Sequence, residues 1–257
     1  EAGLRYETTD VSIEDRTSGE NYDADYKVLL PSASVRYNLT DTDQVYAATA
    51  RTVRRPSFEY LSPATLEEEF GDNDFFGVPT LKPETAWGVD VGYERRLGRS
   101  GVAGVNVFYR KVNDLLEMYN TGPKTGETDV LIYSVRNTGT GKVWGVEFDL
   151  STPLTFVGLD NTGVFLNYSW LDSDIGDEFG SRKFNSQSDY GFNVGVIQDI
   201  PAWQAAFGVT YRKQGDALSR VELEEVKTSY GGDLEIFVEK RFGKNFVLRL
   251  TGQNLLD

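Results

Sequence analysis

The residues best suited to hold a small molecule lie in one long stretch between two strand-like segments, residues 53–84. Arg54 and Arg55 begin this stretch, and a guanidinium can bind a carboxylate or phosphate through two parallel hydrogen bonds. Four aromatic residues follow, and exposed aromatic side chains on a long loop often form binding surface. We therefore predict a ligand-binding surface on this loop. Its candidate residues are Arg54, Arg55, Phe58, Tyr60, Phe75 and Phe76.

These residues also have simpler interpretations. The arginines could pair with nearby acidic residues of the loops, and the aromatics could form a small cluster that packs the loop. The loop also carries an acidic run that could be a solvated surface or could bind calcium through carboxylate oxygens. Its members are Glu67, Glu68, Glu69, Asp72 and Asp74. Their spacing does not match an EF-hand, so we predict no metal site.

The composition excludes several kinds of chemistry. The 257 residues include no Cys and no His, which rules out disulfides, the usual zinc sites and histidine-dependent triads. The formal net charge of −14 argues against nucleic-acid binding, because phosphates require a basic face. Abundant carboxylates alone do not identify a glycosidase pair. We predict a protein that is not an enzyme, needs no cofactor and binds no nucleic acid.

On both sides of this loop, and elsewhere in the chain, apolar and polar residues alternate with a period of two, which is typical of β-strands. In residues 85–96, for example, Trp87, Val89 and Val91 fall on one face, whereas Asp90 and Glu94 fall on the other. We predict about eleven strands. Their approximate ranges are 3–9, 27–39, 44–52, 85–96, 102–112, 143–150, 163–171, 190–198, 203–212, 233–241 and 245–251.

The lengths of the connections distinguish between all-β architectures. Short connections (38–43, 97–101, 200–202 and 242–244) alternate with long ones, and the connection at 152–161 is intermediate. The long connections are about 14–26, 53–84, 119–131, 173–189 and 214–228. Tight turns at one end and long loops at the other are natural for an up-and-down antiparallel barrel. Tyr and Trp near strand ends suit a membrane–water interface, although a sandwich core also uses aromatics.

Four short motifs connect this pattern to a known family. Arg54-Arg55-Pro56-Ser57 leaves one strand, and Gly77-Val78-Pro79-Thr80-Leu81-Lys82-Pro83-Glu84 leads into the next. Gly145-Val146-Glu147 and Asn254-Leu255-Leu256-Asp257 follow in the last strands. In type, order and spacing these motifs resemble the TonB-dependent receptors, with Val78 where that family usually has Asn. The resemblance covers essentially the whole chain.

The resemblance implies an all-β, antiparallel, up-and-down transmembrane β-barrel of 22 strands. Residues 1–257 would be the C-terminal portion, a wall that is not closed by itself. We expect the plug domain, the TonB-contacting segment (TonB box) and the final strand to lie outside this chain. Pro83 lacks an N–H and suits the point where a loop joins a strand. We therefore interpret Leu81–Glu84 as such a junction, with a direct ligand role as the alternative.

The function implied by the resemblance is import across the bacterial outer membrane, in a multi-pass wall. A scarce nutrient of the siderophore, cobalamin or glycan class would bind at the extracellular loops. TonB–ExbB–ExbD would act through the plug to admit it. Membrane lipid and lipopolysaccharide, whose phosphates Arg54 and Arg55 could bind, are further expected partners. The alternatives are a soluble extracellular β-sandwich that binds carbohydrate, and a passive porin.

The polar faces of the predicted strands carry charges that would line the inside of the barrel. They are Arg5, Glu7, Arg36, Asp90, Glu94, Arg110, Glu147, Asp149, Arg212, Glu235, Glu239 and Arg249. Unpaired buried charge is costly. We therefore expect ion pairs between strands, with the plug or water as further partners.

Overall fold

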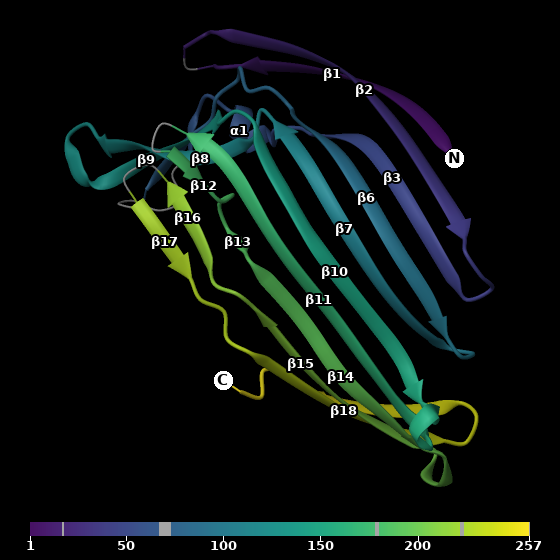
Figure 1. Cartoon of the computed structure of the whole chain (residues 1–257). Coiled ribbons are helices and arrows are strands. Elements are labelled where there is room, and N and C mark those ends of the chain that lie inside the picture. Colours follow the sequence, from purple (N-terminus) through teal and green to yellow (C-terminus); the bar gives the residue numbers. More distant parts are fainter. Residues whose placement is uncertain (17, 67–72, 178–179, 222–223, 257) are drawn as a thin grey trace.

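One large antiparallel sheet dominates the computed structural model (Figure 1), which describes residues 1–16, 18–66, 73–177, 180–221 and 224–256. The strands of its main path lie side by side in the order in which they occur in the chain, and each pairs with the one before it and the one after it. In order, the strands are β1 (Ala2–Glu14), β2 (Asn21–Asn38), β3 (Asp43–Arg54), β6 (Glu84–Leu97), β7 (Gly101–Asn113), β10 (Gly141–Leu154), β11 (Leu159–Asp177), β14 (Tyr190–Ile200), β15 (Ala205–Gln214), β18 (Asp233–Phe242) and β19 (Phe246–Gly252). The predicted up-and-down sheet of about eleven strands is confirmed. Within the described ranges β1 and β19 form opposite edges, so the sheet does not close.

One face of this sheet is apolar and exposed. The register places Val91 opposite Val107, and Val107 opposite Val146. The apolar residues of neighbouring strands therefore lie side by side in rows across the sheet. Val91 and Val107 expose 53% and 52% of their surface. Trp144 lies opposite Tyr109 on the same face. Such a continuous apolar surface is unusual on a soluble protein, and no second sheet covers it in the described part of the chain.

The other face is polar, and the expected pairing between strands is confirmed there. Arg110 Nη2 lies 2.8 Å from an oxygen of Asp90 on the neighbouring strand. Arg212 and Arg249 make longer cross-strand pairs, at 3.6 Å to Glu235 and 3.9 Å to Glu239. Other carboxylates on this face accept hydrogen bonds from amides, as Glu147 does from Asn106 at 3.0 Å.

Glycines on the polar face allow neighbouring groups to approach the backbone closely. A Cβ at Gly145 would lie 2.4 Å from the carbonyl oxygen of Trp170 and 2.7 Å from the Phe108 ring. A Cβ at Gly92 would lie 2.2 Å from the Tyr46 ring. The Trp170 carbonyl is a backbone group that cannot easily move, so position 145 requires glycine, whereas Gly92 leaves room for the Tyr46 ring close to the backbone.

Several predicted connections are shorter in the structure than expected. The predicted loop 14–26 is wrong, because β1 and β2 continue past the alternating segments and pair as far as Glu14 and Asn21. The connection at 152–161 is a tight turn containing the 3₁₀ helix η1 (Thr155–Val157). Trp203 was expected in a strand. It lies instead in the 3₁₀ turn η2 (Pro201–Trp203), and β15 starts at Ala205.

The remaining long connections fold into structure of their own at one end of the sheet (Figure 1). A four-stranded sheet has the order β4 (Thr65–Leu66), β5 (Asp74–Phe76), β9 (Glu127–Asn137), β8 (Leu116–Lys124). A three-stranded sheet has the order β13 (Gln187–Ser188), β16 (Ala217–Val221), β17 (Glu224–Thr228). The short helix α1 (Phe58–Leu61) and strand β12 (Gly180–Arg182), which pairs with β11, complete this end. None of the helices in the described residues is long and apolar enough to cross a membrane.

Candidate functional site

The loops at this end pack over the polar face of the main sheet. Leu61, Leu81, Leu116 and Val135 form a buried cluster drawn from two connections, residues 53–84 and 114–140. Val11 of β1 packs against this cluster. Its side chain lies on the same side of β1 as Glu7 and Thr9, because strand residues two apart share a face. The loop cluster therefore covers the side of the sheet that carries the charged residues.

The structure separates the predicted aromatic residues into two groups. Tyr60 and Phe75 lie together, with ring centroids 5.9 Å apart, and both pack against the buried cluster. Phe58, on α1, exposes 84% of its surface, and Phe76 exposes 41%. Tyr60 and Phe75 thus help to pack the loop, whereas Phe58 and Phe76 are available to an external molecule.

The two predicted arginines make polar contacts with the main sheet. Arg54 Nη1 lies 3.6 Å from the Glu84 carboxylate and keeps 59% of its side chain exposed. Arg55 pairs with Glu7 on β1 and donates a hydrogen bond to the Thr9 hydroxyl at 2.6 Å. Arg54 pairs with an acidic residue at the end of its own loop, as the simpler interpretation expected, whereas the acidic partner of Arg55 lies on strand β1 and not in a loop.

Most of the acidic run lies outside the described residues, namely Glu67, Glu68, Glu69 and Asp72. Asp74 is described and is almost fully buried, with a carboxylate oxygen 3.0 Å from the Lys124 ammonium. Within the described ranges, no group of three or more acidic side chains is arranged to hold a metal ion.

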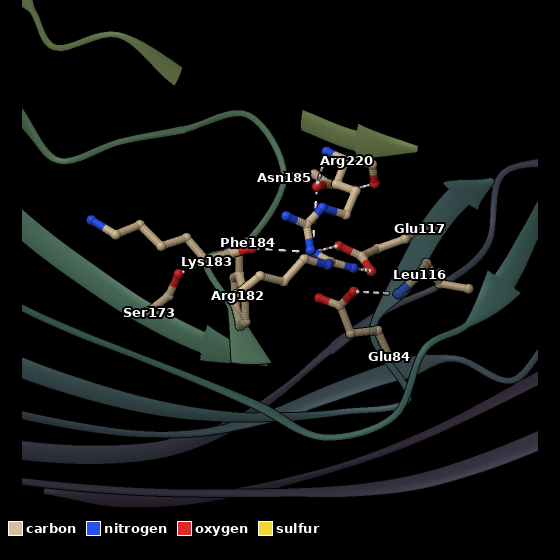
Figure 2. Close-up of polar contacts among 9 residues, drawn as sticks. All are labelled: Glu84, Leu116, Glu117, Ser173, Arg182, Lys183, Phe184, Asn185 and Arg220. Atoms are coloured by element: carbon tan, nitrogen blue, oxygen red, sulfur yellow. Dashed lines mark hydrogen bonds and ion pairs between the residues drawn. The ribbon is translucent and has the colours of Figure 1, made fainter. Parts of the chain in front are cut away.

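A buried ion pair joins two loops that the sequence pattern left separate (Figure 2). Arg182 of β12 binds Glu117 of β8 through two nitrogens, at 2.6 and 3.2 Å. The two side chains expose only 10% and 8% of their surface. A bidentate pair of this kind is among the strongest and most directional polar contacts in proteins. It fixes the β8–β9 hairpin relative to the segment that follows β11.

The polar network continues from Arg182 into the three-stranded loop sheet (Figure 2). Arg182 also donates to the side-chain oxygen of Asn185 at 3.3 Å. That oxygen accepts a second hydrogen bond from the backbone N–H of Arg220, and the Asn185 amide donates to the Arg220 carbonyl. Asn185 thus connects Arg182 to β16, and through it the loops around β8, β12 and β16 are linked.

A cavity of about 260 Å³ opens beside this network. Its lining includes three cations, Arg182, Lys183 and Arg220, and three carboxylates, Asp189, Asp216 and Glu225. A buried side-chain nitrogen of Gln187, which also lines the cavity, has no hydrogen-bond partner. The cavity is slightly smaller than the ~300–1,000 Å³ usual for a drug-sized ligand. It can hold a small polar molecule or one arm of a larger one.

The charges around the cavity perturb one another. The hydrogen bond from Lys183 to the Asp189 carboxylate raises the pKa of that ammonium above its ordinary value. The hydrogen bond from Lys227 lowers the pKa of Asp216. Burial, followed by a hydrogen bond to Glu224, raises the pKa of Tyr133. At neutral pH Lys183 and Asp216 are therefore charged and Tyr133 is neutral, and the arrangement suits recognition of a polar ligand.

The sequence pattern does not mark Glu117, Arg182 or the residues of the cavity as functional. Arg182 lies in the predicted connection 173–189, whereas Glu117 lies just before the predicted connection 119–131, and no periodic pattern marks a contact between residues 65 positions apart. An arginine flanked by glycine, serine and lysine in a loop also resembles an ordinary solvated residue. Only the approach of the folded loops to one another reveals its partner.

Two comparisons relate the chain to known proteins. The model of the family described as "TonB dependent receptor-like, beta-barrel" matches residues 1–255. Among solved structures, the unliganded ferric citrate transporter FecA superposes with a TM-score of 0.72 at 17% identity, over 100% of this chain and 37% of that one.

Two further solved structures give a similar result. A mutant of the ferric enterobactin receptor PfeA from Pseudomonas aeruginosa has a TM-score of 0.65 and 18% identity, over 100% of this chain and 40% of that one. The FrpB iron transporter from Neisseria meningitidis has a TM-score of 0.68 and 17% identity, over 99% and 38%. At these identities the likeness concerns the fold alone. The chain spans about two fifths of the length of these solved chains.

Proposed function

This chain belongs to the TonB-dependent receptor β-barrel family, whose model matches residues 1–255, and we propose that it forms part of the wall of an outer-membrane nutrient importer. The observation that carries this proposal is that the residues matched by the family model fold into an open up-and-down sheet with one exposed apolar face. In the intact receptor the apolar face contacts membrane lipid and lipopolysaccharide. The polar face encloses an N-terminal plug domain.

The two free edges of the sheet support a wall that is completed by other strands. Edge strands carry unpaired N–H and C=O groups, which a membrane cannot satisfy. β1 and β19 therefore pair with further strands of the parent chain, in a closed barrel of 22 strands. The plug, the TonB-contacting segment and the closing strand belong to those other parts.

For the cargo, we propose an iron chelate of the siderophore class. The solved proteins of similar fold are named as receptors or transporters of ferric enterobactin, ferric citrate and iron. The cavity beside Arg182 is lined by three cations, which suit the anionic oxygens of such a chelate, and by three carboxylates, which suit its hydrogen-bond donors. Exposed Phe58 and Phe76 add aromatic contact surface on the neighbouring loop.

Uptake then requires energy from the TonB–ExbB–ExbD complex, transmitted through the plug. The test measures accumulation of radioactive iron by cells that carry the intact parent receptor. Iron is supplied as ferric citrate or as ferric enterobactin, with and without TonB. We expect uptake of at least one chelate, and we expect its loss in cells without TonB.

Other results would redirect the proposal. Uptake that proceeds equally without TonB would indicate a passive porin and overturn active transport. Binding of cobalamin or of a glycan, with neither iron chelate taken up, would overturn the iron class while keeping the transporter. The soluble carbohydrate-binding sandwich has no support in the structure, because the main strands of the described residues form one sheet rather than two packed layers.

A further inference from the structure

The segment Leu81–Glu84 does more than lead the chain into β6. Leu81 is 2% exposed and belongs to the buried loop cluster, and its carbonyl accepts a hydrogen bond from the Tyr26 hydroxyl of β2 at 2.7 Å. The Glu84 carboxylate accepts a hydrogen bond from the backbone N–H of Leu116 at 3.1 Å. This short segment thus contacts β2 on one side and the start of β8 on the other.

Between these two contacts, Asn137 binds the backbone of Lys82. Its side-chain oxygen accepts the Lys82 N–H at 2.9 Å, and its side-chain nitrogen donates to the Lys82 carbonyl at 3.0 Å. Proline at position 83 biases Lys82 towards an extended conformation. In such a residue the N–H and the C=O point to the same side, so one carboxamide can satisfy both.

Asn137 also reaches a third segment. Its side-chain nitrogen donates to the carbonyl of Asp114 at 2.9 Å. Asp114 has a positive φ of 55°, which turns the chain between β7 and β8. The backbone reinforces this junction. The N–H of Leu115 donates to the carbonyl of Gly139 at 3.1 Å, and the N–H of Thr138 donates to the carbonyl of Leu115 at 2.7 Å. One side chain therefore holds the end of loop 53–84, the start of β8 and the end of β9.

We propose that Asn137 is a positioning residue that makes loops 53–84 and 114–140 a single rigid body, which holds the ligand-contacting side of loop 53–84 in place. The expected effect of Asn137 on ligand binding rests on the proposed function. Asn137 need not touch the ligand, because it acts through the Lys82 backbone and through the segment that carries Phe58 and Phe76.

The arrangement allows a matched pair of variants. The junction uses the backbone of Lys82 and not its side chain, so Lys82→Ala should leave it intact. Asn137→Ala removes all three hydrogen bonds. Asn137→Asp keeps an acceptor for the Lys82 N–H but places a carboxylate oxygen against the carbonyls of Lys82 and Asp114, so it should also break the junction.

The first measurement is the distance between spin labels on the two loops, in the intact parent receptor without ligand. The labels are placed at Glu59→Cys on α1 and Thr125→Cys on the β8–β9 turn, both of which are exposed. We expect a narrow distance distribution with native Asn137 and with Lys82→Ala. We expect a broader distribution with both Asn137→Asp and Asn137→Ala. Equal broadening by Lys82→Ala, or none by Asn137→Ala, would overturn the proposal.

The second measurement is the affinity for ferric citrate and ferric enterobactin, with the melting temperature of the barrel recorded in parallel. We expect Asn137→Ala to weaken binding about tenfold while the melting temperature stays unchanged. A fall in both would point to general destabilisation and would count against a positioning role. If neither chelate binds the native receptor, the proposed function fails on its own, and the spin-label distances still decide whether Asn137 joins the loops.

Discussion

Arg182 and Glu117 form a two-point ion pair between loops that are 65 residues apart in the chain, with both side chains about nine-tenths buried. A buried pair of this kind gives limited net stability, because each charge loses its hydration. Removing one partner is nevertheless costly, since it leaves the other charge without compensation. The pair therefore works mainly as a specific junction between loops.

Replacing Glu117 with alanine should loosen this junction. Arg182 would lose its buried two-point carboxylate partner, at a local cost of about 3–5 kcal/mol. Amide hydrogen exchange in β12 and the segment before β13 should accelerate by more than about tenfold in the intact receptor. The matched control is Asp25→Ala, which removes an exposed partner of Lys27 and should change exchange little. Equal effects of the two substitutions would show that burial of the Arg182–Glu117 pair is unimportant.

Gly145 should not tolerate a side chain. The Cβ of Gly145→Ala would meet the Trp170 carbonyl at 2.4 Å, and a backbone group cannot move aside easily. We expect a loss of about 1–3 kcal/mol, measured by denaturant unfolding of the intact barrel in detergent. Gly104→Ala, on the same face of the adjacent strand, has its nearest neighbour at 3.6 Å and serves as the control. The prediction fails if the two variants unfold alike.

The exposed and packed phenylalanines of loop 53–84 should behave differently. Phe75→Ala removes a ring that packs on Tyr60 and on the buried cluster, so exchange in α1 and β5 should become faster. Phe58→Ala should leave exchange unchanged, because the ring is 84% exposed. Under the proposed function, Phe58→Ala should weaken binding of ferric citrate or ferric enterobactin several-fold. Unchanged affinity for both chelates would remove Phe58 from the binding surface.

The contact between Asp216 and Lys227 should depend on pH. The hydrogen bond from Lys227 lowers the pKa of Asp216 below its usual 3.8. The contact therefore stabilises the loop fully above pH 3.8, and this contribution is lost as the pH falls through the lower folded pKa. Carboxyl NMR titration of the intact receptor should show the lowered pKa, and Lys227→Met should shift it back upwards. A pKa that does not respond to Lys227→Met would contradict the assigned cause.

Residues 1–257 expressed alone should not behave as an ordinary soluble domain. The apolar face and the edges at β1 and β19 would all be exposed to water. We expect aggregation unless detergent is present, measured by size-exclusion chromatography. A monodisperse, detergent-free monomer that unfolds cooperatively would contradict the assignment of the apolar face to lipid.

The strands of the main sheet could be predicted well, whereas the loops could not. Alternation from Trp87 to Glu94 indicated both a strand and its two faces, and the structure agrees. The β1–β2 connection was predicted too long, because hairpin pairing extends beyond the alternating residues. The small sheets at β5, β9 and β16 were missed, since two- to eleven-residue strands inside irregular segments carry little periodic signal.

The candidate site was partly predicted. Loop 53–84 was identified from its length and aromatic content, but its residues have different roles. Tyr60 packs inside, Phe58 stays exposed, and Arg55 binds β1. The residue types alone are consistent with each of these roles. The partners decide among them, and they come from distant parts of the chain.

By itself, the sequence determined the order of the hairpins, the polar and apolar faces of each strand, and the family. These follow from local alternation and short motifs, because successive side chains of a strand must point to opposite faces. Only the tertiary structure decided that Arg182 meets Glu117 and that Asn137 holds Lys82. Such contacts depend on how the loops fold back over the polar face. No periodic pattern of residues in the sequence indicates how a loop folds.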